Sequence, residues 1–174
     1  MNPWITQPIE LKGTKVTLLP LEEKHFDELI AQSTDPSIWT HMPVRGMEEA
    51  TLRKALHEAL DKRDVGEQYP FVVLHNDSGK MMGSTRFLPL NAEHRNLEIG
   101  YTWYLPEYWG KGYNEECKFL LLEHCFDVLK TVRVQIITSS KNVRSQKAIE
   151  KIGGQYEGLL RHVVVRNGDK RSVM

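Results

Sequence analysis

The feature that most constrains this chain is a strand pattern followed directly by a glycine loop and an apolar helix. The strand pattern covers Leu97–Leu105 and ends at Pro106. Its apolar residues occupy every second position: Leu97, Ile99, Tyr101, Trp103 and Leu105. A period of two predicts a β-strand whose apolar side chains share one face.

Glycines mark two positions where a ligand can approach the backbone. Gly100 interrupts the strand pattern, and a glycine inside a strand is typical of a β-bulge or of a close approach. Gly110-Lys111-Gly112 stands immediately before a helix, whose free N–H groups and positive end favour a phosphate. The loop is neither a Walker loop nor a dinucleotide fingerprint, so these two glycines alone favour an ordinary strand-to-helix turn.

The rest of the chain alternates between strands and helices, which predicts an α/β (α+β) fold. Strands are predicted at Val16–Leu19, Tyr69–Leu74, Lys80–Leu88, Val132–Thr138 and Gln155–Arg166, and helices at Glu23–Ser33, Met47–Asp64 and Asn142–Ile152. Lys170–Met174 begins a returning strand that the chain leaves unfinished, so a truncated C-terminal strand is expected. Residues 1–174 are predicted to form a single domain.

Composition narrows the class of protein. Lys+Arg and Asp+Glu are both 23 and the pI is about 7.1, so no net basic charge favours nucleic acid or an anionic membrane. No run of about 18 apolar residues or leader pattern is present, and we expect a cytoplasmic protein. Cys117 and Cys125 are eight residues apart in one helical pattern, about 12 Å along its axis, so we expect buried, reduced thiols. No His or Cys spacing predicts a metal site.

Three motifs in order make the chain resemble a known family. They are Ile99-Gly100-Tyr101, Tyr108-Trp109-Gly110-Lys111-Gly112-Tyr113, and the segment from Asn142 to Gly154 followed by Tyr156-Glu157-Gly158. Together they resemble the GNAT superfamily of acyl-CoA-dependent N-acetyltransferases, and its RimJ/RimL-like branch in particular. The resemblance implies a mixed, mostly antiparallel sheet that splays between the Leu97–Leu105 and Val132–Thr138 strands and is flanked by helices.

The resemblance also implies a site for acetyl-CoA in that splay. Its pyrophosphate is expected on the backbone amides of Trp109, Gly110, Lys111, Gly112, Tyr113 and Asn114, and its pantetheine arm along Trp103, Tyr104 and Leu105. Asn142 is expected to contact the cofactor as well. A bulge at Gly100 would free a backbone N–H for the thioester carbonyl, where it stabilises the developing oxyanion.

The sequence departs from the family pattern at three places. Glu107 stands where Gln or Arg is usual, and Asn114-Glu115 occupy positions that small residues often fill. Carboxylates beside a pyrophosphate repel it unless they point away. Ile149 stands where many members carry the tyrosine that protonates the departing thiolate.

The resemblance and the helical spacing assign the catalytic candidates. Ser145 shares a helix face with Asn142 and takes the acid role that a serine has in RimL-like members; the alternative is a helix-capping serine. Glu98, beside the expected bulge, is the candidate base, although the alternation places it opposite Tyr101 and Trp103, where it would be solvated. His94 and His162 are the other candidate bases.

Two classes of function remain open from the sequence. The first is an acetyl-CoA-dependent N-acetyltransferase that acts on a primary amine, either a protein N-terminus or a small molecule, by direct attack in a ternary complex. The second is a CoA-binding regulatory or interaction domain with weakened turnover, which Glu107, Glu115 and the missing tyrosine favour. A homodimer is compatible with either.

Overall fold

The computed structural model describes residues 4–5, 8–42, 48–166 and 169–174, with only the backbone described at 164–166 and 169–171. The chain divides into two compact units, Met1–Gln135 and Ile136–Met174, which are described separately below. No helix in the described part of the chain is long and apolar enough to cross a membrane.

The first unit is built on a six-stranded sheet in which neighbouring strands follow chain order. Its strands are β1 (Leu11–Lys12), β2 (Val16–Pro20), β3 (Tyr69–His75), β4 (Met81–Asn91), β5 (Asn96–Tyr104) and β6 (Arg133–Gln135). The pairs from β1 to β5 are antiparallel and β6 runs parallel to β5. The predicted mixed, mostly antiparallel sheet is confirmed.

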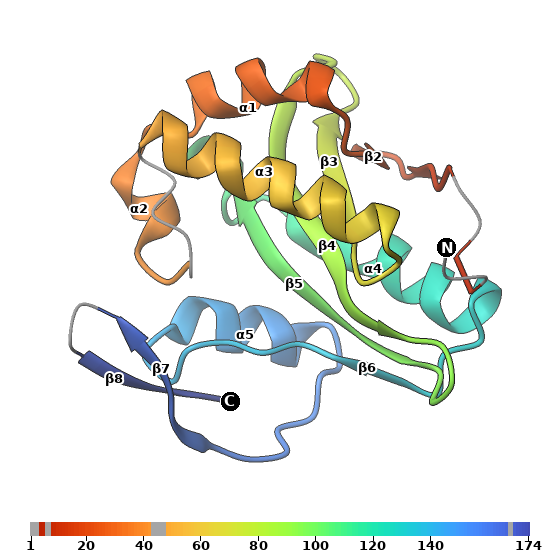
Figure 1. Cartoon of the computed structure of the whole chain (residues 1–174), viewed down its shortest axis with the longest axis vertical. Coiled ribbons are helices and arrows are strands. Elements are labelled where there is room, and N and C mark those ends of the chain that lie inside the picture. Colours follow the sequence, from red (N-terminus) through yellow and green to blue (C-terminus); the bar gives the residue numbers. More distant parts are fainter. Residues whose placement is uncertain (1–3, 6–7, 43–47, 167–168) are drawn as a thin grey trace. The chain divides into compact units, whose positions relative to one another are not determined.

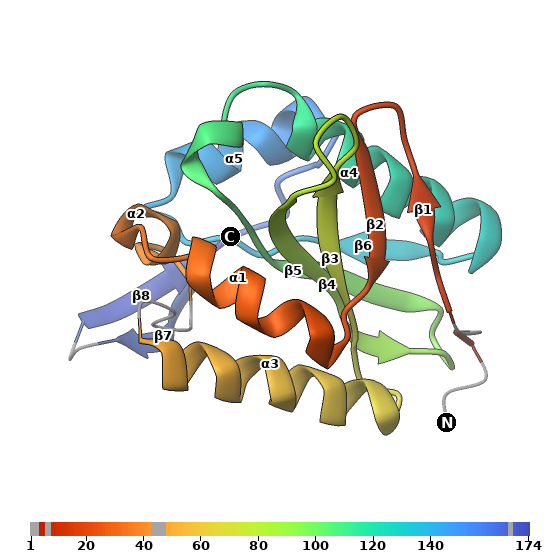
Figure 2. The same cartoon turned by 90° about the horizontal axis from the view of Figure 1, so that it is seen from above.

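Helices cover both faces of this sheet. They are the 3₁₀ turn η1 (Glu23–His25), α1 (Phe26–Gln32), α2 (Pro36–Trp39), α3 (Glu49–Asp64), the 3₁₀ turn η2 (Pro106–Tyr108), α4 (Tyr113–Glu123) and the π-helical turn η3 (His124–Val128). Figures 1 and 2 show α1 and α3 on one face of the sheet and α4 on the other.

The apolar face of α3 explains how the helices attach to the sheet. Leu52, Leu56 and Ala59 recur at helical spacing and are buried, so they form one stripe that packs on the sheet. The same cluster contains Trp103 of β5, whose ring centroid lies 5.4 Å from that of Trp39. This packing holds the end of β5 against the helices.

Strand β6 is shorter than predicted. It pairs with β5 at only three positions, the last of which joins Glu98 to Gln135. The expected strand over Val132–Thr138 is wrong beyond Gln135, because Thr138 exchanges two backbone hydrogen bonds of 2.8 Å with Met174 in the second unit. The β5–β6 ladder therefore ends at Glu98, while β5 continues to Tyr104.

The second unit consists of one helix and a hairpin. Helix α5 (Val143–Lys151) precedes β7 (Leu160–Arg166) and β8 (Asp169–Val173), which pair antiparallel. The returning strand predicted for the C-terminal residues is therefore formed, and it begins at Asp169.

Candidate active site

A β-bulge lies in β5, one residue beyond the glycine that predicted it. Ser84 pairs with Trp103 and Arg86 pairs with Gly100, so the single residue Thr85 stands opposite two residues of β5. Tyr101, the first of these two, has φ of 49°, which an aromatic residue rarely adopts. The extra residue turns the strand locally and interrupts its ladder.

The bulge reverses the alternation of side chains along β5. Glu98 pairs with Leu88 and Gly100 with Arg86, on the face that also carries Trp103. Leu97 and Ile99 lie on the opposite face, because Ile99 pairs with Phe87, whose ring stacks on His124 of η3. The predictions that Leu97, Ile99, Tyr101, Trp103 and Leu105 share one face, and that Glu98 lies opposite Trp103, are wrong because one inserted residue shifts the period-two pattern.

Glu98 lies half-buried at the end of the β5–β6 ladder. Its Oε2 accepts a hydrogen bond of 3.3 Å from Nε2 of Gln135 on β6. Burial raises the pKa of this carboxyl, while the Gln135 hydrogen bond and the charge of Lys118 oppose the rise. A carboxylate with a raised pKa is a stronger base, which fits the predicted role of Glu98 as the proton acceptor.

Gly100 is required by the position of this carboxylate. A Cβ at Gly100 would lie 2.7 Å from Oε1 of Glu98 and 2.9 Å from Cδ2 of Leu88. Both contacts are closer than real Cβ atoms approach, so a side chain at residue 100 would displace the ends of the Glu98 and Leu88 side chains from these positions. The glycine thus links the bulge to the candidate base.

The glycine loop ends as a helix N-terminus. Gly110 has φ of 73° and Gly112 has φ of 84°, and α4 begins at Tyr113 with Gly112 as its N-cap. The first N–H groups of a helix have no partner within it and point along the axis at its positive end. The start of α4 is therefore a position where an anion could accept backbone hydrogen bonds. The prediction that the Trp109 amide binds the pyrophosphate is wrong for this structure, because that N–H donates to the carbonyl of Pro106 at 3.1 Å.

An aromatic and imidazole cluster fixes this loop to the sheet. His75 of β3 makes hydrogen bonds of 3.0 Å with the Tyr113 hydroxyl and 2.9 Å with Oγ of Ser78. The rings of Tyr108 and Tyr113 meet edge to face with centroids 5.5 Å apart. Trp109 Nε1 donates to the carbonyl of Tyr104 at 2.8 Å, which ties the loop to the end of β5.

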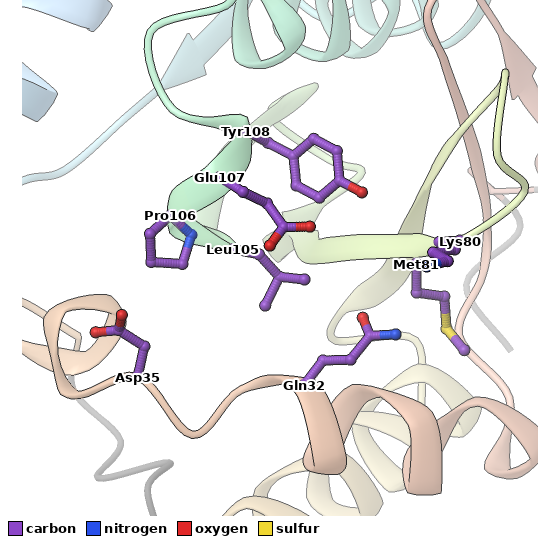
Figure 3. A pocket seen from close by; sticks show the side chains of 8 residues that line it. All are labelled: Gln32, Asp35, Lys80, Met81, Leu105, Pro106, Glu107 and Tyr108. Carbon is purple, nitrogen blue, oxygen red and sulfur yellow. The ribbon is translucent and has the colours of Figure 1, made fainter.

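The acidic residues near the loop have different surroundings. Glu107 is exposed, and it lines an open cavity of about 400 Å³ together with Gln32, Asp35, Lys80, Met81, Leu105, Pro106 and Tyr108. Figure 3 shows the Glu107 carboxylate among these residues. Glu115 lies half-buried in the first turn of α4.

Glu116, which the sequence reasoning missed, has a structural task. Its carboxylate accepts hydrogen bonds from the backbone N–H groups of Thr14 and Lys15 in the β1–β2 turn. A side chain at Gly13 would clash with it, since a Cβ there would lie 2.6 Å from Oε1. The sequence shows an acidic residue four positions after Gly112, but nothing in the local pattern predicts that it binds a turn about a hundred residues away.

The candidate residues of the second unit lie at the start of α5. Asn142 is the N-cap, and its Oδ1 accepts a hydrogen bond of 3.1 Å from the backbone N–H of Ser145. Asn142, rather than Ser145, therefore supplies the cap, and the Ser145 side chain is half-buried. Ile149 follows on the same helix.

The remaining candidates lie elsewhere. His94 and His162 are exposed. Trp39 is buried in the core and donates from Nε1 to the carbonyl of Ser33 at 2.8 Å. Cys117 and Cys125 are buried free thiols, as predicted, and burial raises the pKa of both, which keeps them protonated and unreactive.

Comparison with known proteins agrees with this arrangement. A family model described as an acetyltransferase (GNAT) domain matches residues 15–155. YoaA of Bacillus subtilis, named an uncharacterized N-acetyltransferase, is 32% identical over 92 residues, which make up 53% of this chain and 51% of that protein. The match thus spans about half of that relative.

Solved structures share the fold along nearly the whole chain. A GCN5-related N-acetyltransferase from Brucella melitensis superposes with a TM-score of 0.86 at 26% identity, over 97% of this chain and 77% of that one. A ribosomal-protein-S5-alanine acetyltransferase from Vibrio fischeri gives a TM-score of 0.79 at 14% identity, over 95% and 93%. The chain therefore belongs to the GNAT acetyltransferase family, and its enzyme class is that of an N-acetyltransferase.

Proposed function

We propose that this enzyme moves the acetyl group of acetyl-CoA to a primary amine by direct attack of the amine on the thioester in a ternary complex. The observation that carries the proposal is the bulge at Tyr101–Thr102, in the strand that leads into the glycine loop. A bulge frees a peptide group in the middle of β5, and the loop offers helix N–H groups at its end. Acetyl-CoA needs both, because its thioester requires an oxyanion donor and its pyrophosphate requires an anion site.

The cofactor is proposed to lie along the second half of β5. Its pyrophosphate would accept hydrogen bonds from the amides of residues 110–114, because the Trp109 N–H already donates to Pro106. Its pantetheine arm would follow the backbone of Trp103, Tyr104 and Leu105. Two features support this placement: the β5–β6 ladder ends at Glu98, and His75 holds the loop in place through Tyr113. Asn142 of the second unit is proposed as a further contact.

Proton movements follow from the candidate residues. The ammonium of the acceptor loses a proton to Glu98, directly or through water, and its nitrogen then attacks the carbonyl carbon. The tetrahedral oxyanion is stabilised by the bulge N–H until the carbon–sulfur bond breaks. The attacking nitrogen then releases its second proton to solvent. The Ser145 hydroxyl gives a proton to the departing thiolate and regains one from solvent, so the products are the amide, CoA and the proton held by Glu98.

The inert state of the cysteines supports direct transfer. Cys117 and Cys125 are buried with raised pKa values, so neither is suited to carry the acetyl group as a covalent intermediate. This supports attack by the amine on acetyl-CoA itself.

Two kinds of amine are proposed as the acetyl acceptor. The RimJ/RimL-like motifs and the fold shared with the ribosomal-protein-S5-alanine acetyltransferase favour a protein N-terminus. A small-molecule amine is the second candidate. The test combines calorimetry of CoA binding with acetyl transfer from acetyl-CoA across peptide N-termini, lysine peptides and small amines. Transfer to any amine of the panel supports the proposal. CoA binding with no acetyl transfer to any amine of the panel would favour a binding domain instead.

A further inference from the structure

The bulge in β5 places an aromatic residue in a strained backbone conformation. Tyr101 has φ of 49°, a region that costs energy for residues with a Cβ and persists only where the surroundings hold it. Any function of the bulge therefore depends on the residues that hold Tyr101 in this conformation. Two buried cations, Arg86 of β4 and Lys118 of α4, contact the bulge from opposite faces.

Arg86 contacts the bulge on the face of α3. Its guanidinium carbon lies 4.3 Å from the centroid of the Tyr101 ring, within cation–π distance. Its Nη1 donates to Oε1 of Gln68 at 3.0 Å, and the side chain is 8% exposed. Among the described residues, no carboxylate forms an ion pair with Arg86, so the Tyr101 ring and a neutral amide are the observed contacts of this charge.

Lys118 contacts the bulge on the face of α4. Its Nζ donates to Oγ1 of Thr102 at 2.7 Å, and that oxygen lies 2.7 Å from Oγ1 of Thr85. Thr85 in turn donates to the carbonyl of Gly100 at 3.5 Å. Lys118 is 5% exposed and, like Arg86, has no ion-pair partner within 4 Å among the described residues.

The direction of this hydrogen-bond chain is fixed at both ends. An ammonium only donates, so Thr102 accepts from Lys118; Thr85 has one hydroxyl hydrogen, which goes to the Gly100 carbonyl. Thr102 must therefore donate to Thr85. The chain runs from Lys118 through Thr102 and Thr85 to Gly100, and it holds the Gly100 carbonyl toward β4.

The orientation of one peptide group follows from this chain. In a trans peptide the C=O and N–H bonds point in opposite directions. Since the Gly100 carbonyl points toward β4, the N–H of Tyr101 points away from β4. This is the side of β5 on which the ladder with β6 ends at Glu98.

We propose that Lys118 is a positioning residue that holds the Tyr101 N–H in place as the oxyanion donor for the thioester. The inference rests on the proposed function. Lys118 acts through Thr102 and Thr85 on the Gly100–Tyr101 peptide, and Arg86 contacts the Tyr101 ring from the other face. A buried ammonium with no ion-pair partner within 4 Å opposes folding, because the more distant charge of Glu98 only partly offsets its desolvation. Its retention at this position is explained by the peptide that it orients.

The test compares variants that keep the volume of each side chain and remove its polar contact. Lys118→Met removes the ammonium, Thr102→Val removes the hydroxyl that links it to the bulge, and Thr102→Ser keeps that hydroxyl. Thr131→Val is the matched control, because Thr131 is also buried and its hydroxyl has no hydrogen-bond partner. Each protein is assayed for kcat, for KM of acetyl-CoA and for its melting temperature.

Removal of an oxyanion donor lowers kcat by roughly 100- to 1,000-fold in other enzymes, so its misorientation is expected to lower kcat by about 10- to 100-fold. We expect this loss in Lys118→Met and Thr102→Val, with KM for acetyl-CoA within about threefold of wild type and no fall in melting temperature. Thr102→Ser and Thr131→Val are expected to keep wild-type turnover.

Three results would overturn the inference: wild-type kcat in Lys118→Met and Thr102→Val, a rise in KM without a fall in kcat, or equal losses in Thr102→Ser and Thr102→Val. If wild-type protein itself fails to transfer acetyl groups to the amine panel, the proposed function fails. An active wild type with equally active variants overturns this inference and leaves the proposed function in place.

Discussion

Replacing buried Lys118 with methionine should make the protein more stable at neutral pH. Burial lowers the pKa of Lys118 from 10.5 to about 8 in the folded state. Each pKa unit corresponds to about 1.4 kcal/mol, so the folded state disfavours the ammonium by about 3 kcal/mol relative to the unfolded chain. Methionine has a similar length and carries no charge, so Lys118→Met removes this penalty.

The pH dependence gives the sign of the effect. Between pH 8 and 10.5 the unfolded chain binds a proton at Lys118 that the folded protein has released, so the contribution of Lys118 to the free energy of unfolding rises with pH across this window. Below pH 8 both states are protonated and the full penalty applies. The stability difference between Lys118→Met and wild type should therefore be largest at pH 7 and should fall toward zero as the pH approaches 10.5.

Urea unfolding of both proteins at several pH values from 7 to 10 measures this difference. Subtracting the two curves cancels the contributions of groups that Lys118 does not influence, such as Tyr69, whose pKa is raised by burial. Lys54→Met serves as the control because Lys54 is 78% exposed. A Lys118→Met protein that is less stable than wild type at pH 7, or a difference that stays constant with pH, would refute the reasoning.

Three further predictions concern the site itself. Gly100→Ala should lower kcat at least tenfold, about 1.4 kcal/mol in the barrier, because its Cβ would displace the Glu98 carboxylate; steady-state assays that show wild-type kcat would contradict this. Gly112→Ala should raise KM for acetyl-CoA and destabilise the protein by about 1–2 kcal/mol, because φ is 84° at this residue. Gly79→Ala is the control: φ is 67° there and an added Cβ would meet no atom within 4 Å, so it should show the same loss of stability with no change in KM. Glu98→Gln should lower kcat/KM and remove the acidic limb of its pH profile, which in wild type falls as the pH drops through the raised pKa of Glu98; an unchanged acidic limb would exclude Glu98 as the base.

The order of elements and the glycine loop were predictable because each depends on local sequence. Alternation, glycine placement and helical spacing are set by neighbouring residues, and the structure confirms the hairpin of β3 and β4, the strand β5 and the helix after the loop. The bulge was expected from Gly100, and it lies at Tyr101–Thr102. These features are present in the folded protein because its tertiary contacts reinforce the local preferences.

The faces of β5 and the buried cations were not predictable from the sequence. One inserted residue moves Glu98 and Trp103 to the same face, and no period-two pattern reveals where the insertion falls. Lys118 and Arg86 stand in apolar surroundings where a sequence pattern favours apolar residues or solvated charges. Their partners Thr102 and Tyr101 are distant in sequence and are identified only by the packed structure.

Direct attack of an amine on acetyl-CoA is tested most directly by the initial-velocity pattern of the wild-type enzyme, with intact-protein mass spectrometry in the absence of an acceptor. The account predicts intersecting double-reciprocal lines when acetyl-CoA and the amine are varied together, and no acetylated enzyme without the amine. Parallel lines together with an enzyme that carries an acetyl group would contradict it, because that result requires a covalent intermediate.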